Sequence, residues 1–172
     1  MAPIHAPQTY ILDEGPARFD TDVAAQLRPL LDRLLAAPKH PRAEHQRGSI
    51  PDRPGVYLFS SADGWPVYVG QSRRVRTRLA EHCRENADHN SASFAYNIAK
   101  KNAMKADIIL AGSRAEVSVH ADFVEHFRAA KLLVAQMPVQ FVTEGDAALR
   151  TVFEVYATYA LGTHEYNTFE TH

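Results

Sequence analysis

The chain of 172 residues contains a single cysteine, Cys83. One cysteine excludes an internal disulfide and any zinc site built from several cysteines, so we expect a reducing, cytoplasmic environment. No stretch approaches the roughly 18 apolar residues of a membrane-spanning helix, and the first residues lack the charged start and apolar centre of a signal peptide. We therefore expect a soluble protein without a membrane partner.

A strong net charge is also missing, because the formal charge is −1. The charges are nevertheless unevenly spread: residues 71–105 hold eight Lys and Arg against three Asp and Glu, which is +5 and leaves −6 for the rest. Surface potential follows local charge over about 8 Å at physiological salt. This segment can therefore form a phosphate-binding surface, although a merely solvated helix face is the alternative interpretation.

One core domain is expected, because a chain of this length with 45% hydrophobic residues can bury one core and a small appendage. Residues 1–50 are predicted to form a helical extension and a linker, with Thr21 capping a leucine-rich helix that Pro38 ends. The domain is predicted over residues 51–172, with helices inserted at about residues 90–136.

Two strand-like blocks, Gly55-Val56-Tyr57 and Tyr68-Val69-Gly70, lie ten residues apart. Both blocks belong to segments rich in β-branched and aromatic residues, and residues 60–66 between them are turn formers. The pattern predicts a β-hairpin.

An arginine-rich helix is predicted directly after the hairpin, over residues 73–83, with Ser72 as its N-cap. Arg78 and His82 are four residues apart, so they share one face of this helix. A helix with this pattern presents cationic side chains at the mouth of the hairpin.

Four more elements are expected along the rest of the chain. Helices are predicted over residues 93–104 and 115–136, a third strand over 137–143, and a last helix over 147–161 that begins after Asp146. In the second of these helices we expect four core residues: Phe123, Phe127, Leu132 and Leu133. The apolar stripe of the last helix is interrupted by Glu154, which lies either at the edge of the stripe or in a cleft.

This order of elements resembles the GIY-YIG nuclease superfamily. The resemblance rests on the two glycine-tyrosine blocks, on Arg78 ten positions after Tyr68, on Glu154 in the helix after the third strand, and on Asn167 beyond it. It covers residues 54–169. The opening is similar to the nuclease half of nucleotide-excision-repair endonucleases, and the added helices are similar to the restriction-enzyme branch. The resemblance implies an α/β (α+β) fold with a small, mostly antiparallel three-stranded sheet flanked by helices.

The resemblance also implies a metal-dependent endonuclease that hydrolyses phosphodiester bonds in DNA by one-step attack of water. Such a reaction needs a base, cations over the developing charge and help for the leaving oxygen. Glu154 would hold Mg²⁺ or Mn²⁺, because such a hard cation keeps several waters and needs only one or two carboxylates. Arg78 would clamp a phosphate oxygen with its rigid, permanently charged fork.

Two candidates remain for the general base. The resemblance implies Tyr57, with Tyr68 orienting water or phosphate, but a free phenol titrates near pH 10 and needs a lowered pKa. His82 competes for the role, since its ordinary pKa near 6.5 needs no adjustment.

Five further residues are expected to contact the substrate or shape its site: Gly70, Gln71, Arg73, Arg74 and Asn167. Gly70 suits a tight turn where backbone approaches phosphate. Gln71 stands where several relatives carry lysine, so Arg73 or Arg74 would replace that charge. The resemblance implies that Asn167 fixes the active-site end of the chain.

Each of these residues also has a structural interpretation. The tyrosines can be packing residues of strands, and Glu154 can be a surface carboxylate paired with Arg150, four residues earlier. The alternative function is a catalytically silent nucleic-acid-binding module of the same fold. The sequence leaves open DNA or RNA, the substrate's structure, cleavage of one or both strands, and whether a homodimer or a protein partner supplies specificity.

Overall fold

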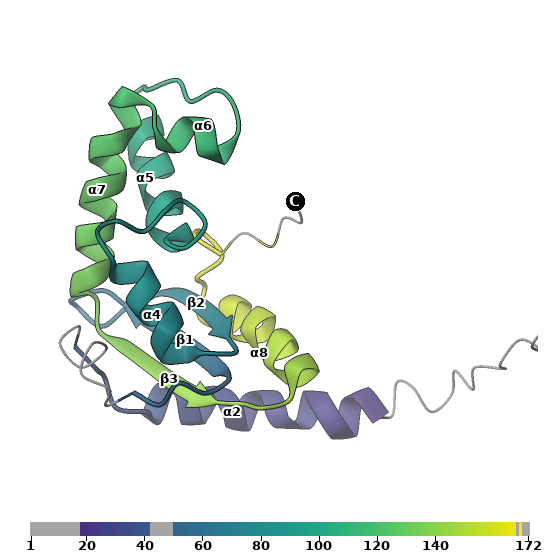
Figure 1. Ribbon diagram of the computed structural model, residues 1–172. Helices are drawn as coiled ribbons and strands as arrows, with labels where there is room; N and C mark the ends of the chain where they lie inside the picture. The colour runs from purple at the N-terminus through teal and green to yellow at the C-terminus, as the bar shows by residue number, and fades with distance from the viewer. Residues whose placement is uncertain (1–17, 42–49, 168, 170–172) are drawn as a thin grey trace, which may run out of the picture.

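The computed structural model describes residues 18–41, 50–167 and 169. Its centre is a three-stranded antiparallel sheet of β1 (Gly55–Ser60), β2 (Pro66–Ser72) and β3 (Val139–Thr143), in the order β2-β1-β3 (Figure 1). The predicted α+β fold, the hairpin and the third strand are confirmed, although β3 begins two residues later than expected. All six residues of β1 are buried, because β1 has a partner strand on each side and helices on both faces.

One face of the sheet is covered by α2 (Ala25–Ala36) and α8 (Ala147–Ala160) (Figure 1). Alternate sheet residues Val56, Leu58 and Val142 pack there. Four leucines of α2 complete this core: Leu27, Leu30, Leu31 and Leu34. The leucine-rich helix near the N-terminus thus packs directly against the sheet.

The other face of the sheet, with Tyr57 and Phe59, packs against α4 (Val75–Cys83), α5 (Ser93–Lys105) and α7 (Ala121–Gln136). These helices and the short α6 (Arg114–Ser118) rise to one side of the sheet (Figure 1). The core on this side is rich in aromatic rings, and Phe94 of α5 stacks on Tyr68 with ring centroids 4.3 Å apart. None of the described helices is long and apolar enough to cross a lipid bilayer.

The first helix differs from its prediction at the start and agrees at the end. Thr21 does not cap it, because Thr21 lies inside a π-helical turn, Asp20–Ala24, that leads into α2. Helix α2 ends at Ala36, and Ala37 is extended as expected for a residue before proline. Most of the predicted extension and linker, residues 1–17 and 42–49, lies outside the described residues, and the division near residue 51 stays a prediction.

The helix expected over residues 115–136 is two helices. Helix α6 has its own capping box, in which Ser113 accepts a hydrogen bond from the backbone of Glu116 and the Glu116 carboxylate accepts one from the backbone of Ser113. The prediction of Leu132 and Leu133 as core residues is wrong, since the exposed fraction is 48% for Leu132 and 46% for Leu133. The buried face of α7 instead repeats every three or four residues through Phe123, Phe127, Ala130 and Val134.

Helix α4 begins later than predicted, and Ser72 is not its N-cap. Ser72 is the last residue of β2, and its hydroxyl accepts the backbone N–H of Arg74 at 2.9 Å. The free N–H of Thr77 in the first turn is instead accepted by Asp52 at 3.0 Å, and the Thr77 hydroxyl donates to the same carboxylate at 2.9 Å. A carboxylate from the segment before β1 therefore fixes the start of the basic helix.

Candidate active site

The hairpin places Tyr57 and Tyr68 on one face of the sheet. Tyr57 lies opposite Gly70, and Tyr68 lies opposite Phe59, so the two tyrosines are diagonal neighbours. Their ring centroids are 6.4 Å apart. Tyr57 is fully buried and Tyr68 is half-buried, so Tyr68 is the more accessible of the two hydroxyl-bearing rings.

Gly70 makes room for the ring of Tyr57. A Cβ atom at residue 70 would lie 2.4 Å from the Tyr57 hydroxyl oxygen and 2.5 Å from Cζ, which is closer than atoms can approach. The glycine of the second block is thus needed by the tyrosine of the first block. This contact gives a physical reason for the pairing of the two motifs across the hairpin.

Helix α4 brings His82 to Tyr57. His82 is fully buried, and its Nε2 lies 2.9 Å from the Tyr57 hydroxyl oxygen. Its other ring nitrogen, Nδ1, has no hydrogen-bond partner among the described residues. Burial, and secondarily the charge of Arg78, holds the pKa of His82 well below its ordinary value of 6.5. His82 is therefore neutral at pH 7.

Burial also raises the pKa of both tyrosines. The pKa of Tyr57 lies well above 10, raised first by burial and then by Tyr68, while the positive charge of Arg78 acts in the opposite direction. Burial and the nearby negative charge of Glu154 raise the pKa of Tyr68 to about 12. Both phenols are therefore protonated at neutral pH unless a further cation lies beside them.

Arg78 is held at the start of α5. Its Nη1 donates to the carbonyl oxygen of Ser91 at 2.9 Å, and its Nη2 donates to the Ser93 hydroxyl at 3.0 Å. A weaker ion pair joins Nη1 to Glu81 at 3.4 Å. Because its planar fork is fixed by α5, Arg78 is oriented before any ligand arrives.

Helix α8 brings Glu154 to the same group of residues. Asp146 caps this helix as predicted, since its carboxylate accepts the backbone N–H of Leu149 at 2.8 Å. Burial raises the pKa of the half-buried Glu154 above its ordinary value, whereas hydrogen bonds from Gln71 and the charges of Arg78 and Arg150 oppose this shift. The carboxylate thus lies within electrostatic range of Arg78 and both tyrosines.

Asn167 pairs with the free edge of β2. Its side-chain amide donates to the carbonyl oxygen of Val69, and its Oδ1 accepts the N–H of Val69 at 3.2 Å and the Thr163 hydroxyl at 3.1 Å. One side chain therefore satisfies both backbone groups of a residue on an edge strand. The chain after α8 is fixed beside the second tyrosine block.

The structure thus brings Tyr57, Tyr68, Arg78, His82 and Glu154 together at the edge of β2, with Gln71 and Asn167 beside them. Arg73 and Arg74 are exposed and precede the first turn of α4, and their expected contact with the substrate stays a prediction. Arg74 also forms an ion pair with Asp52 at 3.1 Å.

Sequence reasoning missed two supports of the site. Ser93 orients Arg78, and Arg150, considered only as a surface partner of Glu154, is 5% exposed and donates from Nε to Gln71 Oε1 at 2.9 Å. The sequence did carry a signal for the role of Arg150, because this arginine lies on the face of α8 that packs against the sheet.

The donor set limits the kind of metal that fits. No group of three or more His, Cys, Asp or Glu side chains that could hold a metal lies within the part of the chain that the structure describes. Glu154 alone fits a hard divalent cation that keeps most of its waters and takes its remaining ligands from a phosphate. The residues present therefore suit Mg²⁺ or Mn²⁺ better than Zn²⁺, which takes several protein ligands.

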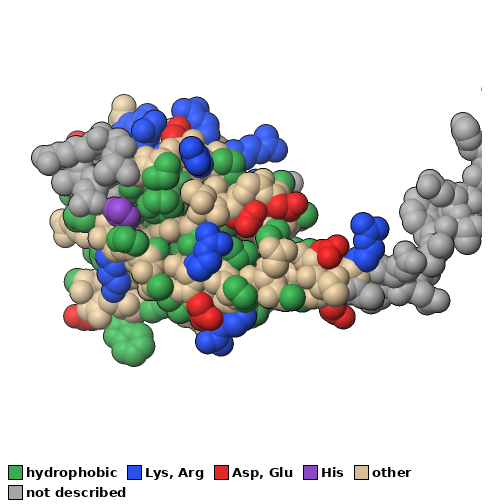
Figure 2. Space-filling view, turned by 90° about the horizontal axis from the view of Figure 1, so that it is seen from below, with side chains coloured by type: hydrophobic (Ala, Val, Ile, Leu, Met, Phe, Trp, Pro, Cys, Tyr) green, Lys and Arg blue, Asp and Glu red, His purple; other side chains and the backbone are tan. Residues whose placement is uncertain are grey.

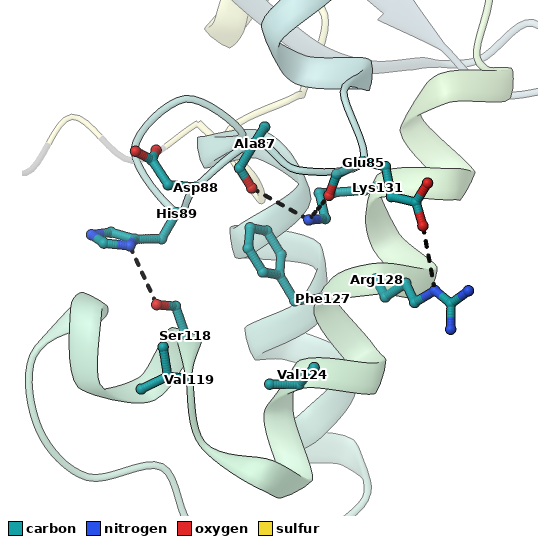
Figure 3. A pocket seen from close by; sticks show the side chains of 10 residues that line it. All are labelled: Glu85, Ala87, Asp88, His89, Ser118, Val119, Val124, Phe127, Arg128 and Lys131. Atoms are coloured by element: carbon teal, nitrogen blue, oxygen red, sulfur yellow. Dashed lines mark hydrogen bonds and ion pairs between the residues drawn. The ribbon is translucent and has the colours of Figure 1, made fainter.

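A pocket of ≈ 380 Å³ lies elsewhere, between the α4–α5 loop, α6 and α7 (Figure 3). The Lys131 ammonium group donates there to the carbonyl oxygens of Glu85 and Ala87, and Ser118 lies 3.3 Å from Nδ1 of His89. None of the site residues above lines this pocket.

On the surface formed by α2, acidic, basic and hydrophobic side chains are interspersed (Figure 2).

Comparison with known proteins identifies one segment of the chain. The family model of the UvrC-like GIY-YIG domain matches residues 53–117. This range contains both tyrosines, Arg78 and His82, whereas Glu154 and Asn167 lie beyond it.

Three curated proteins illustrate the similarity. The UvrABC system protein C of Koribacter versatilis is 40% identical over 48 residues, which is 27% of this chain and 8% of the relative. That of Saccharopolyspora erythraea is 49% identical over 35 residues, which is 20% of this chain and 5% of the relative. Excinuclease cho of Escherichia coli K12 is 44% identical over 45 residues, which is 24% of this chain and 15% of the relative.

The aligned segments thus span only 5 to 15% of these relatives. No solved structure matches the chain significantly. The match to the UvrC-like domain and the paired tyrosine blocks across the hairpin agree with each other, and both support the GIY-YIG nuclease superfamily for the segment of residues 53–117.

Proposed function

We propose that this protein is a metal-dependent endonuclease that hydrolyses phosphodiester bonds in DNA by a single attack of water. The observation that carries the proposal is the convergence of Glu154 from α8 with Tyr57, Tyr68 and Arg78 at the edge of β2. The names of the relatives, an excinuclease and subunits of the UvrABC system, support DNA as the substrate.

Arg78 would bind the scissile phosphate. Its guanidinium is permanently charged, and its contacts with Ser91 and Ser93 hold the fork in one orientation. A fixed cation stabilises the negative charge that develops on the phosphate oxygens without reorganising during the reaction. Tyr68, half-buried beside Arg78, would orient the phosphate or the attacking water.

Tyr57 is the better general base of the two candidates. His82 is fully buried and its pKa is lowered, so a proton on both its nitrogens is strongly disfavoured. If Nε2 of His82 carries the ring proton, it donates to the Tyr57 oxygen, and only an acceptor, Nδ1, is left unpaired. The Tyr57 phenol would first lose its proton to solvent; in that tautomer His82 would donate to the resulting phenolate, which would then take a proton from the attacking water.

Glu154 would hold the divalent metal, Mg²⁺ or Mn²⁺, on which GIY-YIG nucleases generally depend. When bound, this metal supplies charge neutralisation at the phosphate and at the leaving oxygen. The same positive charge beside Tyr68 and Tyr57 would lower the pKa of both phenols, in the direction that the base needs.

Glu154→Gln tests the proposal. The substitution keeps the size of the side chain and removes the charge, so we expect cleavage of plasmid and branched DNA in Mg²⁺ or Mn²⁺ to disappear while DNA binding remains. Tyr159→Ala, at a residue of the same helix that is 71% exposed, is the matched control. If the wild-type protein binds DNA but never cuts it with any metal or substrate, the chain is a nucleic-acid-binding module instead.

A further inference from the structure

The side chain of Gln71 lies between two residues of α8. Its Oε1 accepts a hydrogen bond from Nε of Arg150 at 2.9 Å, and its Nε2 donates to the hydroxyl oxygen of Thr151 at 3.1 Å. Gln71 belongs to β2 and directly follows Gly70, so it links the tyrosine hairpin to the helix that carries Glu154.

Only one orientation of the Gln71 amide satisfies both neighbours. Arginine has donors and no acceptor, so it must face the amide oxygen. The Thr151 hydroxyl has one hydrogen, which it donates to the carbonyl oxygen of Ala147 at 2.8 Å. Its oxygen can therefore only accept from Gln71, and the NH₂ group of Gln71 must face α8 at Thr151.

Arg150 is itself held in place. It is 5% exposed, and its Nη1 donates to the backbone carbonyl of Glu144 at 3.1 Å in the turn before α8. A buried guanidinium that loses its partners is costly, because its charge and its donors remain desolvated. Because the turn before α8 holds Arg150 in place, Arg150 in turn holds the side-chain oxygen of Gln71 in place.

Glu154 lies one turn beyond Arg150 and Thr151 on the same helix, so residues 150, 151 and 154 present neighbouring side chains to the end of β2. Hydrogen bonding from Gln71 lowers the pKa of Glu154, so the two side chains lie near each other. The NH₂ group that Arg150 and Thr151 orient thus faces α8 about one turn before Glu154.

We propose that Arg150 and Gln71 are positioning residues for Glu154: Arg150 fixes the Gln71 amide so that its NH₂ group holds the Glu154 carboxylate in one orientation. This inference rests on the proposed function, in which Glu154 holds the metal. A carboxylate has about four acceptor sites, so one bond from Gln71 orients the group and leaves other lone pairs for a cation. Substituting a residue that orients a metal-binding side chain typically lowers metal affinity or activity by 10- to 100-fold.

Three variants test this arrangement: Gln71→Leu, Arg150→Met and the double variant. Mn²⁺ binding to the full chain is measured by the electron paramagnetic resonance signal of free Mn²⁺, and cleavage is measured over a range of Mn²⁺ concentrations. We expect Gln71→Leu to raise the half-saturating Mn²⁺ concentration by about 10-fold or more. Because Arg150 acts through Gln71, the half-saturating Mn²⁺ concentration of the double variant should be no higher than that of Gln71→Leu alone.

Gln140→Leu is the matched control. Gln140 is a buried glutamine of β3, and its Nε2 donates to the carbonyl oxygens of Leu35, in the last turn of α2, and of Ala37, just after it, rather than to α8. We expect it to lower the melting temperature without moving the Mn²⁺ dependence. If Arg150→Met does not fold, the contrast between Gln71→Leu and Gln140→Leu still decides the role of Gln71.

The possible results separate this inference from the proposed function. Unchanged Mn²⁺ dependence in Gln71→Leu, or independent effects of the two substitutions that multiply in the double variant, would overturn the positioning role while cleavage by the wild type still supports the nuclease. A wild type that binds Mn²⁺ but never cleaves would refute the nuclease, yet a shift of Mn²⁺ binding in Gln71→Leu would still support the positioning role. A wild type that binds no Mn²⁺ would contradict both.

Discussion

The hydroxyl oxygen of Tyr57 and Nε2 of His82 lie 2.9 Å apart inside the protein, although 25 residues separate them in the chain. The two residues were alternative candidates for the same role, and they are instead direct partners. A paired tyrosine and histidine behave as one unit, so substituting both should not multiply the losses from substituting each.

Tyr57→Phe removes the proposed base and should slow cleavage by about 10²-fold or more. His82→Leu removes the donor to the phenolate and should slow cleavage less. The double variant should be as slow as Tyr57→Phe alone, because His82 acts on the reaction through Tyr57. Single-turnover rates in saturating metal measure these effects, with DNA affinity as the control. A double variant much slower than Tyr57→Phe would show that His82 acts independently.

His82 should also make stability depend on pH. Its pKa is lowered on folding, so below about pH 6.5 the unfolded chain binds a proton that the folded chain excludes. The contribution is complete above the unfolded pKa and is lost as the pH falls, by at most about 1.4 kcal/mol per pH unit. Urea unfolding of the wild type and His82→Leu between pH 7.5 and 5.5 measures the difference. Equal slopes for both proteins would place the pH dependence elsewhere.

Gly70→Ala should damage the site through Tyr57. The added methyl group would collide with the phenol ring, so either the ring or β2 must shift, at a cost of about 1–3 kcal/mol. We expect lower stability together with loss of cleavage, measured by urea unfolding and a plasmid assay. Gly145→Ala is the matched control, because no atom lies within 4 Å of a Cβ built there. Full activity of Gly70→Ala would contradict the need for a bare backbone under Tyr57.

Asn167→Asp tests how the chain after α8 is attached. A carboxylate accepts but does not donate, so the carbonyl oxygen of Val69 would lose its partner and face a negative charge. We expect a loss of about 1–3 kcal/mol at neutral pH and faster hydrogen exchange at the Val69 amide. The exposed Asn102→Asp on α5 is the control. Unchanged exchange at Val69 would mean that Asn167 does not protect the edge of β2.

Local sequence was sufficient for the hairpin, α5, α8 and the position of α2's end. These features depend on neighbouring residues: turn formers at 60–66, the cap at Asp146, and the proline at 38 that excludes helix from the residue before it. Where capping groups came from a distant segment, the prediction was wrong. Asp52, which lies before β1, accepts a backbone N–H in the first turn of α4, and no local sequence pattern indicates such a contact.

The candidate site divides in the same way. The sequence by itself determined the spacing of the tyrosine blocks, Arg78 and His82, since they lie in one continuous segment that the UvrC-like domain matches. Tertiary structure alone decided that His82 bonds to Tyr57, that Gly70 makes room for a ring, and that a buried Arg150 fixes Gln71 beside Glu154. These contacts join strands and helices up to 79 residues apart, and their geometry depends on how the two faces of one small sheet are packed.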